Sequence, residues 1–289
     1  MSFSKIVARA QLTSRDVALF DSHRFTIARA IENRLDFSKA EIIGSFARDT
    51  AIHGSSDVDL LVVLRKRSLT WGDSLKRSTT VLADVRLALQ DRFPGTMVGK
   101  DGQAVVVGFN DGQHPVDVVP ACYLQQGGPY NHPVYGIPDG AGGWLVTSPS
   151  SHNRLVAEAD GRAGGKLKYA AQIFKYWRCT RSVVVPLSGF HAELLLAHEG
   201  VCEGARSYAE IFRDLLVILS NRGCSALNDP LDISGRIEAA ATSAKRAQAV
   251  RTVDDSARHA DAAVQAESAG NYREALRQWQ MAFNDRFPG

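Results

Sequence analysis

The feature that most constrains the fold is a nearly continuous apolar run at residues 58–64, VDLLVVL, which begins within a pair of aspartates two residues apart. A run of this length and apolarity is typical of a strand that is buried on both faces. Side chains alternate along a strand, so Asp57 and Asp59 should point to the same face. Two carboxylates held together repel each other, and a divalent cation would neutralise them; oxygen ligands favour Mg²⁺ or Mn²⁺ over zinc.

A glycine–serine pair precedes this run. Gly44 and Ser45 end a short apolar stretch, residues 40–44, so we expect a turn from a strand into a helix. There glycine lets the backbone approach a phosphate group, free N–H groups point at it, and the serine hydroxyl adds a donor. Either feature alone is common as a plain turn or cap. Joined at a spacing of eleven residues and followed by a buried strand, they predict a phosphate and metal site.

A third carboxylate lies on a second apolar run. Asp117 is part of residues 115–122, PVDVVPAC, and has valines on both sides. A lone aspartate in a buried strand is costly unless it is paired or bound to a metal. If this strand lies beside residues 58–64, the three carboxylates converge. Such a cluster is a template for two metal ions about 4 Å apart.

The remaining pattern predicts an α/β half followed by a helical half. Apolar periodicity favours helices over 13–35 and 73–92, the first capped by Thr13 or Ser14, and a strand over 104–109. A turn at 110–114 joins that strand to the next one. Further helices are predicted at 153–160, 165–180, 188–199, 206–221, 234–248, 254–267 and 271–283.

The stretch 125–152 is rich in glycine and proline and is predicted to be a loop. We place a boundary there, between an N-terminal catalytic lobe that includes the long first helix (1–150) and a helical lobe (151–289). A chain of 289 residues with 45% apolar content is long enough for such an arrangement.

Composition excludes several classes of protein. With 34 basic and 31 acidic residues, the net charge of +3 is too small for a histone-like polycation. Four cysteines without a Cys-x-x-Cys pair predict free thiols in a reducing compartment rather than a disulfide framework. The N-terminal residues lack the apolar segment of a secretory signal, and no run approaches 18 apolar residues. We therefore expect a cytoplasmic protein that does not enter a membrane.

The segment that carries the glycine–serine pair and the two aspartates, GSFARDTAIHGSSDVDLLVVL, resembles the signature of the DNA-polymerase-β-like nucleotidyltransferases. Asp117, in VDVVPA, resembles the third carboxylate of the 2′-5′-oligoadenylate synthetases. Downstream runs, YGIPDGAGGWLVTSPSSH, GGKLKYAAQIFKYW and LSGFHAELL, are similar to those of the bacterial cGAS/DncV-like nucleotidyltransferases, or CD-NTases. The resemblance implies an α+β fold: a polymerase-β-like lobe, with a mixed sheet and helices, plus a helical lobe that closes the cleft.

The resemblance also implies roles for single residues. Gly44 and Ser45 would bind the triphosphate of a donor nucleotide, ATP, GTP or another nucleoside triphosphate. Asp57, Asp59 and Asp117 would hold two Mg²⁺ or Mn²⁺ ions, and Asp117 would help to deprotonate the attacking hydroxyl. That hydroxyl attacks the α-phosphorus in line and pyrophosphate leaves, so positioning and charge stabilisation do most of the work. Thr50, which matches the family's threonine, is interpreted as support for the loop.

A basic helix follows the predicted boundary. Between Gly161 and Arg181 there are six basic residues and no acidic one. Lys168 and Lys175 are seven residues apart and share a face, which is either a solvated surface or the wall of a phosphate-binding cleft. The resemblance makes Lys175, in IFKYW, and Ser188, in LSGFHAE, further candidates for triphosphate contacts.

Other features are weaker. Tyr130, Tyr135 and Trp144 either stack on a base or pack a hinge. His198 and Cys202, four residues apart on a predicted helix, are better explained by core packing than by zinc. The last residue in the sequence, Gly289, is either a frayed end or, as in some relatives, the site at which a regulatory partner conjugates the protein in a ubiquitin-like transfer.

Three functions from different classes remain. The first is a magnesium-dependent synthase that joins nucleoside triphosphates into a cyclic di- or trinucleotide second messenger in anti-phage (CBASS) signalling. The second is a nucleotidyltransferase for an RNA 3′ end or a small-molecule acceptor, although the mild charge argues against a stable nucleic-acid partner. The third is a nucleotide-binding or toxin–antitoxin protein with a degenerate site, which the intact set of carboxylates disfavours. We expect the first.

Overall fold

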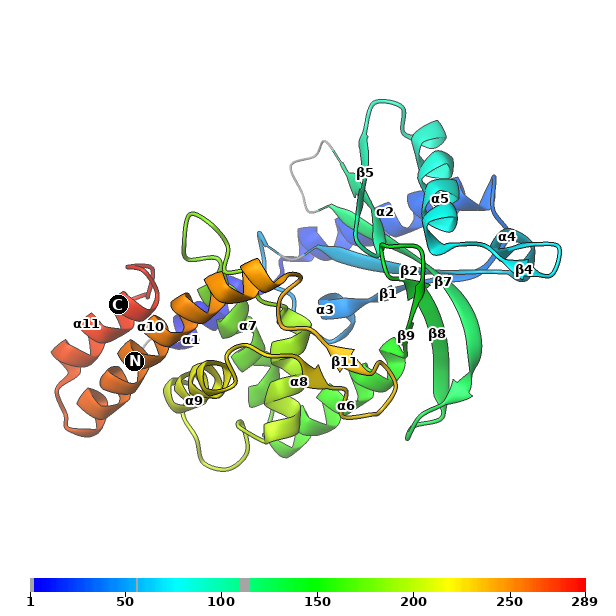
Figure 1. The fold of residues 1–289 in the computed structure, drawn as a ribbon. Coiled ribbons are helices and arrows are strands. Elements are labelled where there is room, and N and C mark those ends of the chain that lie inside the picture. Colours follow the sequence, from blue (N-terminus) through cyan, green and yellow to red (C-terminus); the bar gives the residue numbers. More distant parts are fainter. Residues whose placement is uncertain (1–2, 56, 110–114) are drawn as a thin grey trace.

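The protein has two lobes, one built on a mixed sheet and one built of helices (Figure 1). The structure is a computed structural model that describes residues 3–55, 57–109 and 115–289. The α+β class predicted from the sequence is confirmed. The predicted turn at 110–114 lies outside the described residues.

The sheet places two apolar strands side by side at its centre. Strand β7 (Val116–Gly127) lies parallel to its neighbour β2 (Val58–Leu64), whereas the other pairings within the described sheet are antiparallel. Two further strands extend the sheet from β7. Strand β8 (His132–Pro138) pairs with β7, and β9 (Trp144–Thr147) pairs with β8. Along the main path the order is β1 (Phe37–Ile43), β2 (Val58–Leu64), β7 (Val116–Gly127), β6 (Ala104–Gly108) and β5 (Met97–Asp101).

Helices cover one face of this sheet. The even-numbered residues of β2 are buried against α2 (Ser14–Glu32) and α5 (Ser78–Arg92). Leu61 and Val63 point to the opposite face, where they pack with side chains of β7. Asp59 shares their parity, so it lies on the face that α2 and α5 leave uncovered. Both faces of β2 are therefore packed against apolar side chains, as the continuous apolar run in its sequence predicts.

The second lobe is a helical bundle around an aromatic core. Trp177 is fully buried in it, and its Nε1 donates to the Ser256 hydroxyl and to the carbonyl of Ala282. Helix α1 (Phe3–Ala10) packs here, with Phe3 inside the aromatic cluster. The other helices are α6 (Pro149–Arg162), α7 (Lys166–Arg178), α8 (Gly189–Glu199), α9 (Tyr208–Asn221), α10 (Ser243–Ser268) and α11 (Tyr272–Ala282).

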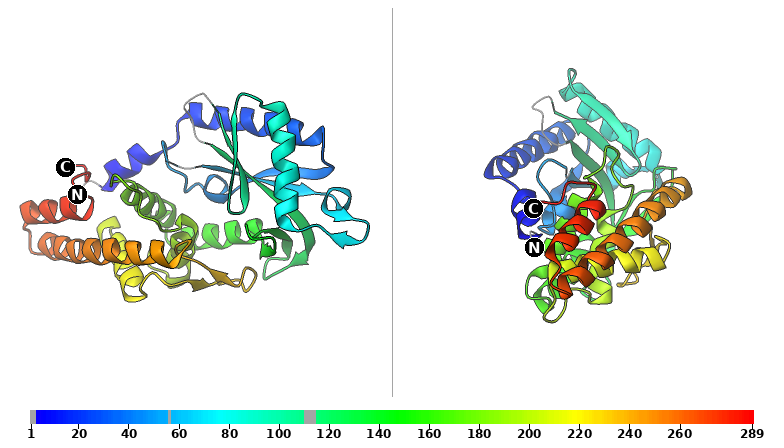
Figure 2. Two further views of the ribbon diagram at one scale, coloured as in Figure 1. Left: turned by 45° about the horizontal axis from the view of Figure 1, so that its top comes forward. Right: turned by 90° about the vertical axis from the view of Figure 1, so that its left-hand side faces the viewer.

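The two ends of the chain meet in this lobe. Figure 2 shows α1 and α11 close together at its outer end, and the Lys5 ammonium donates to the Gly289 carbonyl. The predicted cap of α2 is confirmed, because the Thr13 side chain accepts from the Asp16 amide and the Asp16 carboxylate accepts in return. No helix among the described residues is long and apolar enough to cross a membrane. All four cysteines are free thiols.

The prediction of a loop over 125–152 was wrong. Strands β8 and β9 and the start of α6 lie within that stretch. Most of its glycines lie in the turns between the strands, and in one of these turns the Asp139 carboxylate accepts from the amides of Ala141, Gly142 and Gly143. Composition therefore located the turns but concealed the short strands between them.

Three helix predictions were also wrong in extent. Residues 234–248 and 254–267 do not form two helices, because α10 runs unbroken from Ser243, and residues before it form β11 (Arg236–Ile237), paired with β10 (Leu227–Asn228). No glycine or proline interrupts 243–268, so packing against α9 and α11 continues the helix. The helix predicted over 73–92 begins only at Ser78.

A short helix and a small hairpin precede α5. They are α4 (Lys66–Leu69), β3 (Thr70–Trp71) and β4 (Ser74–Leu75).

A buried carboxylate holds the turn that follows β10. Asp229 accepts from the amides of Leu231, Ile233 and Ser234, and it lies 3.1 Å from Nε2 of His152 on α6. This turn carries Ile233 against Gly128, where a Cβ atom would lie only 2.7 Å from Cδ1 of Ile233. The turn therefore forms one of the contacts between the two lobes.

We expect the stability contributed by Asp229 to depend on pH. Although burial opposes ionisation, His152 and the turn amides lower the pKa of Asp229 from 3.8 to about 2. Its contribution, at most about 2 kcal/mol, is therefore present above pH 3.8 and lost as the pH falls toward 2. Urea unfolding of wild type and Asp229→Asn should show a stability gap that narrows below pH 4. A gap independent of pH would contradict this.

Candidate active site

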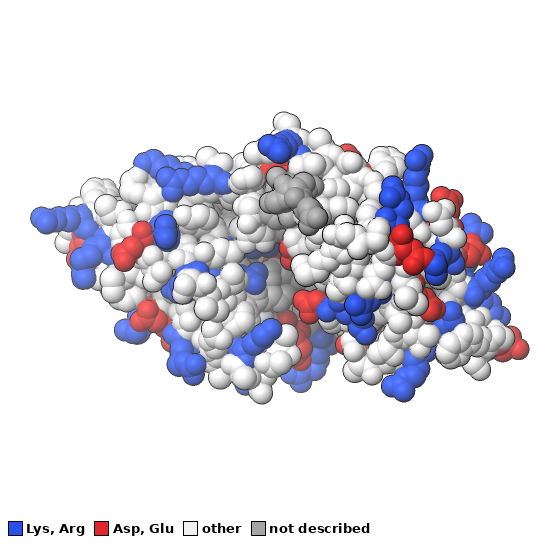
Figure 3. Space-filling view, turned by 90° about the horizontal axis from the view of Figure 1, so that it is seen from above, with Lys and Arg blue, Asp and Glu red and all other residues white. Residues whose placement is uncertain are grey.

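The register of two strands brings the predicted carboxylates together. Asp59 of β2 lies directly opposite Asp117 of β7, and Asp57 immediately precedes β2. All three line one cavity of about 450 Å³ between the lobes. Figure 3 shows the hollow between the lobes, with acidic and basic side chains at its margin. The convergence predicted from strand alternation is therefore present.

The carboxylates are held where they are difficult to ionise. Burial raises the pKa of Asp59 to about 6; Arg48 opposes this shift and Asp57 adds to it. Burial and repulsion from Asp59 and Asp57 raise the pKa of Asp117 to about 7. A divalent cation would relieve this repulsion, because it replaces the lost hydration of the carboxylates and neutralises their charge.

The residues fit a magnesium or manganese site by their chemistry. All three ligands that the sequence predicts are carboxylates, the donors that these hard cations prefer. Among the described residues, no three or more His, Cys, Asp or Glu side chains already stand close enough together to hold a metal ion. Asp57, Asp59 and Asp117 remain the predicted ligands.

The glycine of the predicted phosphate turn is required by the position of Asp59. Gly44 opens the short helix α3 (Gly44–Ala47) with φ of +68°, a conformation that other residues rarely adopt. A Cβ atom at this position would lie 1.9 Å from Oδ2 of Asp59. The next side chain, Ser45, lines the cavity. The turn thus lies directly against Asp59, which places the predicted phosphate-binding turn beside a predicted metal ligand.

A buried ionic cluster, Arg48–Thr50–Lys175–Glu193, joins this turn to the helical lobe. Glu193 of α8 is fully buried, with Oε2 2.5 Å from Nε of Arg48 and Oε1 2.6 Å from Nζ of Lys175. The Thr50 hydroxyl donates to the same Oε1 at 2.7 Å, and Lys175 donates to the Thr50 carbonyl. Thr50 therefore supports the loop, and one carboxylate fixes two cations at the wall of the cavity.

One face of α7 also contacts Asp49 and Ala51, on either side of Thr50 in the loop. Lys168 pairs with Asp49 at 2.9 Å, and the Gln172 amide donates to the carbonyls of Asp49 and Ala51. With Lys175, these side chains lie at helical spacing along one side of α7. The shared face predicted for the two lysines exists, and it contacts the loop that follows Ser45.

The predicted triphosphate contacts from the helical lobe are placed differently. Lys175 lines the cavity, but its ammonium is occupied by Glu193 and Thr50. The Ser188 hydroxyl caps α8 by accepting from the His191 amide, and Ser188 is not among the residues that line the cavity. Its neighbour Gly189 does line it. Both remain predictions as phosphate ligands.

Two weaker alternatives are decided by packing. Tyr135 is buried in the sheet core, the Tyr130 hydroxyl donates to Glu158, and Trp144 Nε1 donates to the Lys76 carbonyl, so none of the three lines the cavity. Helix α8 ends before Cys202, which is buried in the helical core. The aromatic residues and Cys202 therefore have packing roles.

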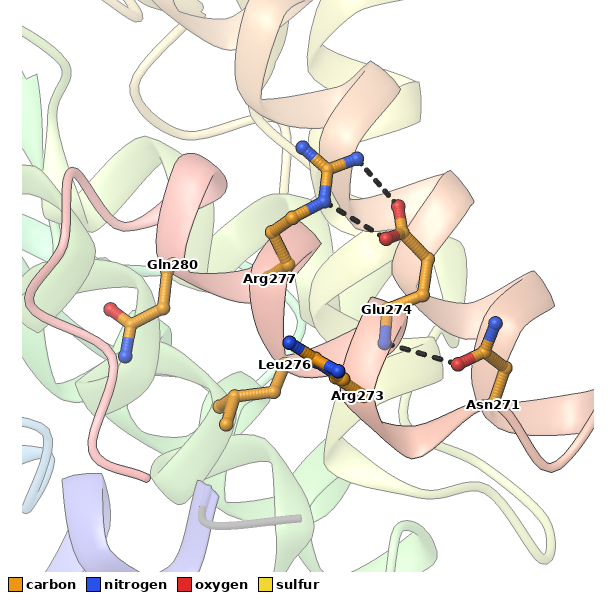
Figure 4. Close-up of a pocket in the computed structure, with 6 residues that line it drawn as sticks. All are labelled: Asn271, Arg273, Glu274, Leu276, Arg277 and Gln280. Atoms are coloured by element: carbon orange, nitrogen blue, oxygen red, sulfur yellow. Dashed lines mark hydrogen bonds and ion pairs between the residues drawn. The ribbon is translucent and has the colours of Figure 1, made fainter.

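A second hollow, of about 490 Å³, lies on α11 but offers no comparable chemistry (Figure 4). All its residues come from α11 or its cap, and its carboxylate is already paired, since Glu274 accepts from Arg277 at 2.7 and 2.9 Å. The cavity between the lobes is therefore the candidate active site. The lining of the second hollow is Asn271, Arg273, Glu274, Leu276, Arg277 and Gln280.

Comparison with known proteins identifies the family. A family model described as the Second Messenger Oligonucleotide or Dinucleotide Synthetase domain matches residues 1–159, which include the turn and all three aspartates. The chain belongs to this family. It is therefore a nucleotidyltransferase, and its resemblance to the bacterial CD-NTases is confirmed.

Relatives match over nearly the whole chain. A probable cyclic nucleotide synthase of Bacillus cereus is 22% identical, with 87% of this chain and 83% of the relative covered. A cyclic AMP-AMP-AMP synthase of Acinetobacter sp. is 27% identical, with 91% and 78% covered. The solved structure of E. coli MS115-1 CdnC with ATP has a TM-score of 0.73 at 17% identity, with 99% and 98% covered. The last of these likenesses supports the two-lobed fold.

Sequence reasoning did not identify three residues that line the cavity of this nucleotidyltransferase: Arg48, Arg178 and Glu193. Glu193 and Arg48 are 145 residues apart in the chain, so no local pattern pairs them. One signal was available, because Glu193 lies within the apolar helix segment HAELLLA, where a carboxylate requires a partner. Arg178, which also lines the cavity, was counted only as part of the basic helix.

We expect Glu193→Gln to destabilise the protein strongly. Arg48 and Lys175 lower the pKa of Glu193 to about 2 against the effect of burial, and the neutral amide would leave two buried cations facing each other. Breaking a buried pair in this way costs about 3–5 kcal/mol. Denaturant unfolding measures the loss, with Glu203→Gln, which removes an exposed pair with Arg162, as the control. A loss below about 1 kcal/mol would show that Glu193 does not bind the lobes together.

Proposed function

We propose that this enzyme joins nucleoside triphosphates into a cyclic di- or trinucleotide, with Mg²⁺ or Mn²⁺ as cofactor and pyrophosphate as the leaving group. The observation that carries the proposal is the register of β2 and β7, which faces Asp59 with Asp117 beside the turn at Ser45. A cavity of about 450 Å³ with basic residues on its opposite wall suits a nucleotide triphosphate.

The residues divide the work by position. The proposal places the α-phosphate at Asp57, Asp59 and Asp117, which would hold the metal ions, and the rest of the triphosphate along Ser45 and α7. When bound, the metal ions would neutralise the charge that develops on the phosphoryl oxygens. Asp117 would take the proton of the attacking 2′- or 3′-hydroxyl. The bond between the attacking oxygen and the α-phosphorus forms as the bond from the α-phosphorus to pyrophosphate breaks.

The relatives support nucleoside triphosphates as substrates. E. coli CdnC was solved with ATP, and the Vibrio cholerae DncV cyclic AMP-GMP synthase was solved with the linear intermediate 5′ pppA(3′,5′)pG. The Acinetobacter relative is named as the synthase of a cyclic trinucleotide. Both product sizes therefore occur among similar proteins, and our proposal keeps both. The proposed role in anti-phage (CBASS) signalling rests on the CD-NTase resemblance.

The experiment that tests the proposal incubates the protein with four α-labelled nucleoside triphosphates and Mg²⁺ or Mn²⁺. We expect a small labelled product that resists phosphatase, and omission of single nucleotides names its bases. The Asp57→Asn/Asp59→Asn variant should make none, while it folds as stably as the wild type or more so, because the substitution removes repulsion. Product formed in excess EDTA would contradict the metal role. Transfer to added tRNA instead would favour the RNA-acceptor alternative.

We also propose that Gly289 takes part in conjugation to a partner protein. Gly289 is exposed, and its carbonyl is held near α1 by Lys5. E. coli CdnC was solved in complex with a HORMA protein, which shows that a similar protein binds a protein partner. Deletion of Gly289 should abolish covalent adducts of this protein in cells, as detected by immunoblotting. Unchanged adducts would contradict the proposal.

A further inference from the structure

The basic residues of the active-site cavity are not equally available to a ligand. Arg48 and Lys175 are both committed to Glu193, at 2.5 and 2.6 Å. Arg178, one turn after Lys175 on α7, also lines the cavity. Its Nε donates to the Val185 carbonyl at 3.1 Å, and it forms no ion pair with a carboxylate of the described residues. Within the part of the chain that the structure describes, its terminal nitrogens thus have no carboxylate partner.

The surroundings of Arg178 suit an anion. Burial lowers the pKa of Arg178, because the guanidinium has lost part of its hydration. At Gly189, on the neighbouring helix, a Cβ atom would lie 3.7 Å from Nη1 of Arg178 and 2.8 Å from Cε of Lys175. The missing side chain therefore lets Lys175 pack directly against the start of α8, with the Arg178 guanidinium beside it.

Arg178 also lies close to the catalytic loop. The next residue, Cys179, has its sulfur 2.9 Å from the hydroxyl of Ser55, which is two residues before Asp57. Both Cys179 and Ser55 line the same cavity. Arg178 is thus on the helical wall of the cavity that holds the aspartates.

We propose that Arg178, rather than Lys175, is the main cation of the helical lobe that binds the terminal phosphates of the nucleotide. This inference rests on the proposed function, which places the α-phosphate at the aspartates. The phosphates beyond it carry the remaining negative charge, and they match a guanidinium that pairs with no carboxylate of residues 3–55, 57–109 and 115–289, whereas a sugar or base does not. A guanidinium also binds two phosphate oxygens at once. Lys175 then acts through Glu193 and Thr50, as a positioning residue for the loop.

The test measures equilibrium binding, so that it does not depend on product formation. The probes are the α,β-methylene analogues of ATP and GTP, with AMP and GMP for comparison, in Mg²⁺ by calorimetry. Arg178→Gln should weaken binding of the triphosphate analogue that the wild type prefers by about 10- to 100-fold, and binding of the monophosphate by less than about 3-fold. Added salt should weaken analogue binding more in the wild type than in the variant.

Two further variants separate charge from structure. Arg178→Lys loses the bond to Val185, as Arg178→Gln does, but keeps the charge, so we expect it to retain intermediate affinity. Lys166→Gln removes one charge from the same helix at a site outside the cavity, where Lys166 donates to the Gly204 carbonyl, and it should bind as the wild type does. Equal losses in Arg178→Gln and Arg178→Lys, or equal losses for tri- and monophosphate, would overturn the inference.

The outcome also distinguishes this inference from the proposed function. If the wild type makes a cyclic product while Arg178→Gln binds the analogue normally, Arg178 is not the phosphate ligand and the proposed function stands. If the analogue binds through Arg178 but no cyclic product forms, the inference stands and the proposed function fails. A wild type that binds neither analogue, and also fails to bind the corresponding analogues of CTP and UTP, contradicts both.

Discussion

The parallel pairing of β2 with β7 is the constraint on which the site depends. It places Asp59 opposite Asp117 on the sheet face that α2 and α5 leave free. Burial and mutual repulsion make both carboxylates hard to ionise, and the Gly44 turn is pressed so close to Asp59 that only glycine fits. The strands thus hold together groups that would separate in solution. This is the expected design of a site that is completed by a cation and a polyphosphate.

The second lobe is positioned by ionic contacts rather than by a shared apolar core. Glu193 binds Arg48 and Lys175, and Lys175 binds the loop at Thr50, so the helix that faces the cavity is fixed to the loop that follows the phosphate turn. The apolar residues instead form separate clusters, one in the helical lobe and the others in the sheet lobe. Such an arrangement keeps a polar cavity between two stable bodies, with Lys175 and Arg178 on the helical wall and the three aspartates on the wall formed by the sheet.

The sequence predicts the chemistry of this site better than its boundaries. Asp57, Asp59 and Asp117 could be identified because strand alternation assigns each to a face, and Thr13 could be identified because caps are local. The partners of Glu193 could not, since Arg48 is 145 residues away and pairing over that distance is decided by the fold. Strands β8 and β9 were hidden by the glycines near their turns, and the single helix α10 was divided at residues 249–253, which contain no helix breaker.

The most direct test of this account is a crystal structure with Mn²⁺ and a non-reactive nucleoside triphosphate analogue, in which anomalous scattering locates the metal. The account predicts manganese between Asp59 and Asp117, with the phosphates of the analogue extending from there past Ser45 toward α7. A bound nucleotide with no manganese at the aspartates, or manganese bound elsewhere in the protein, would contradict it.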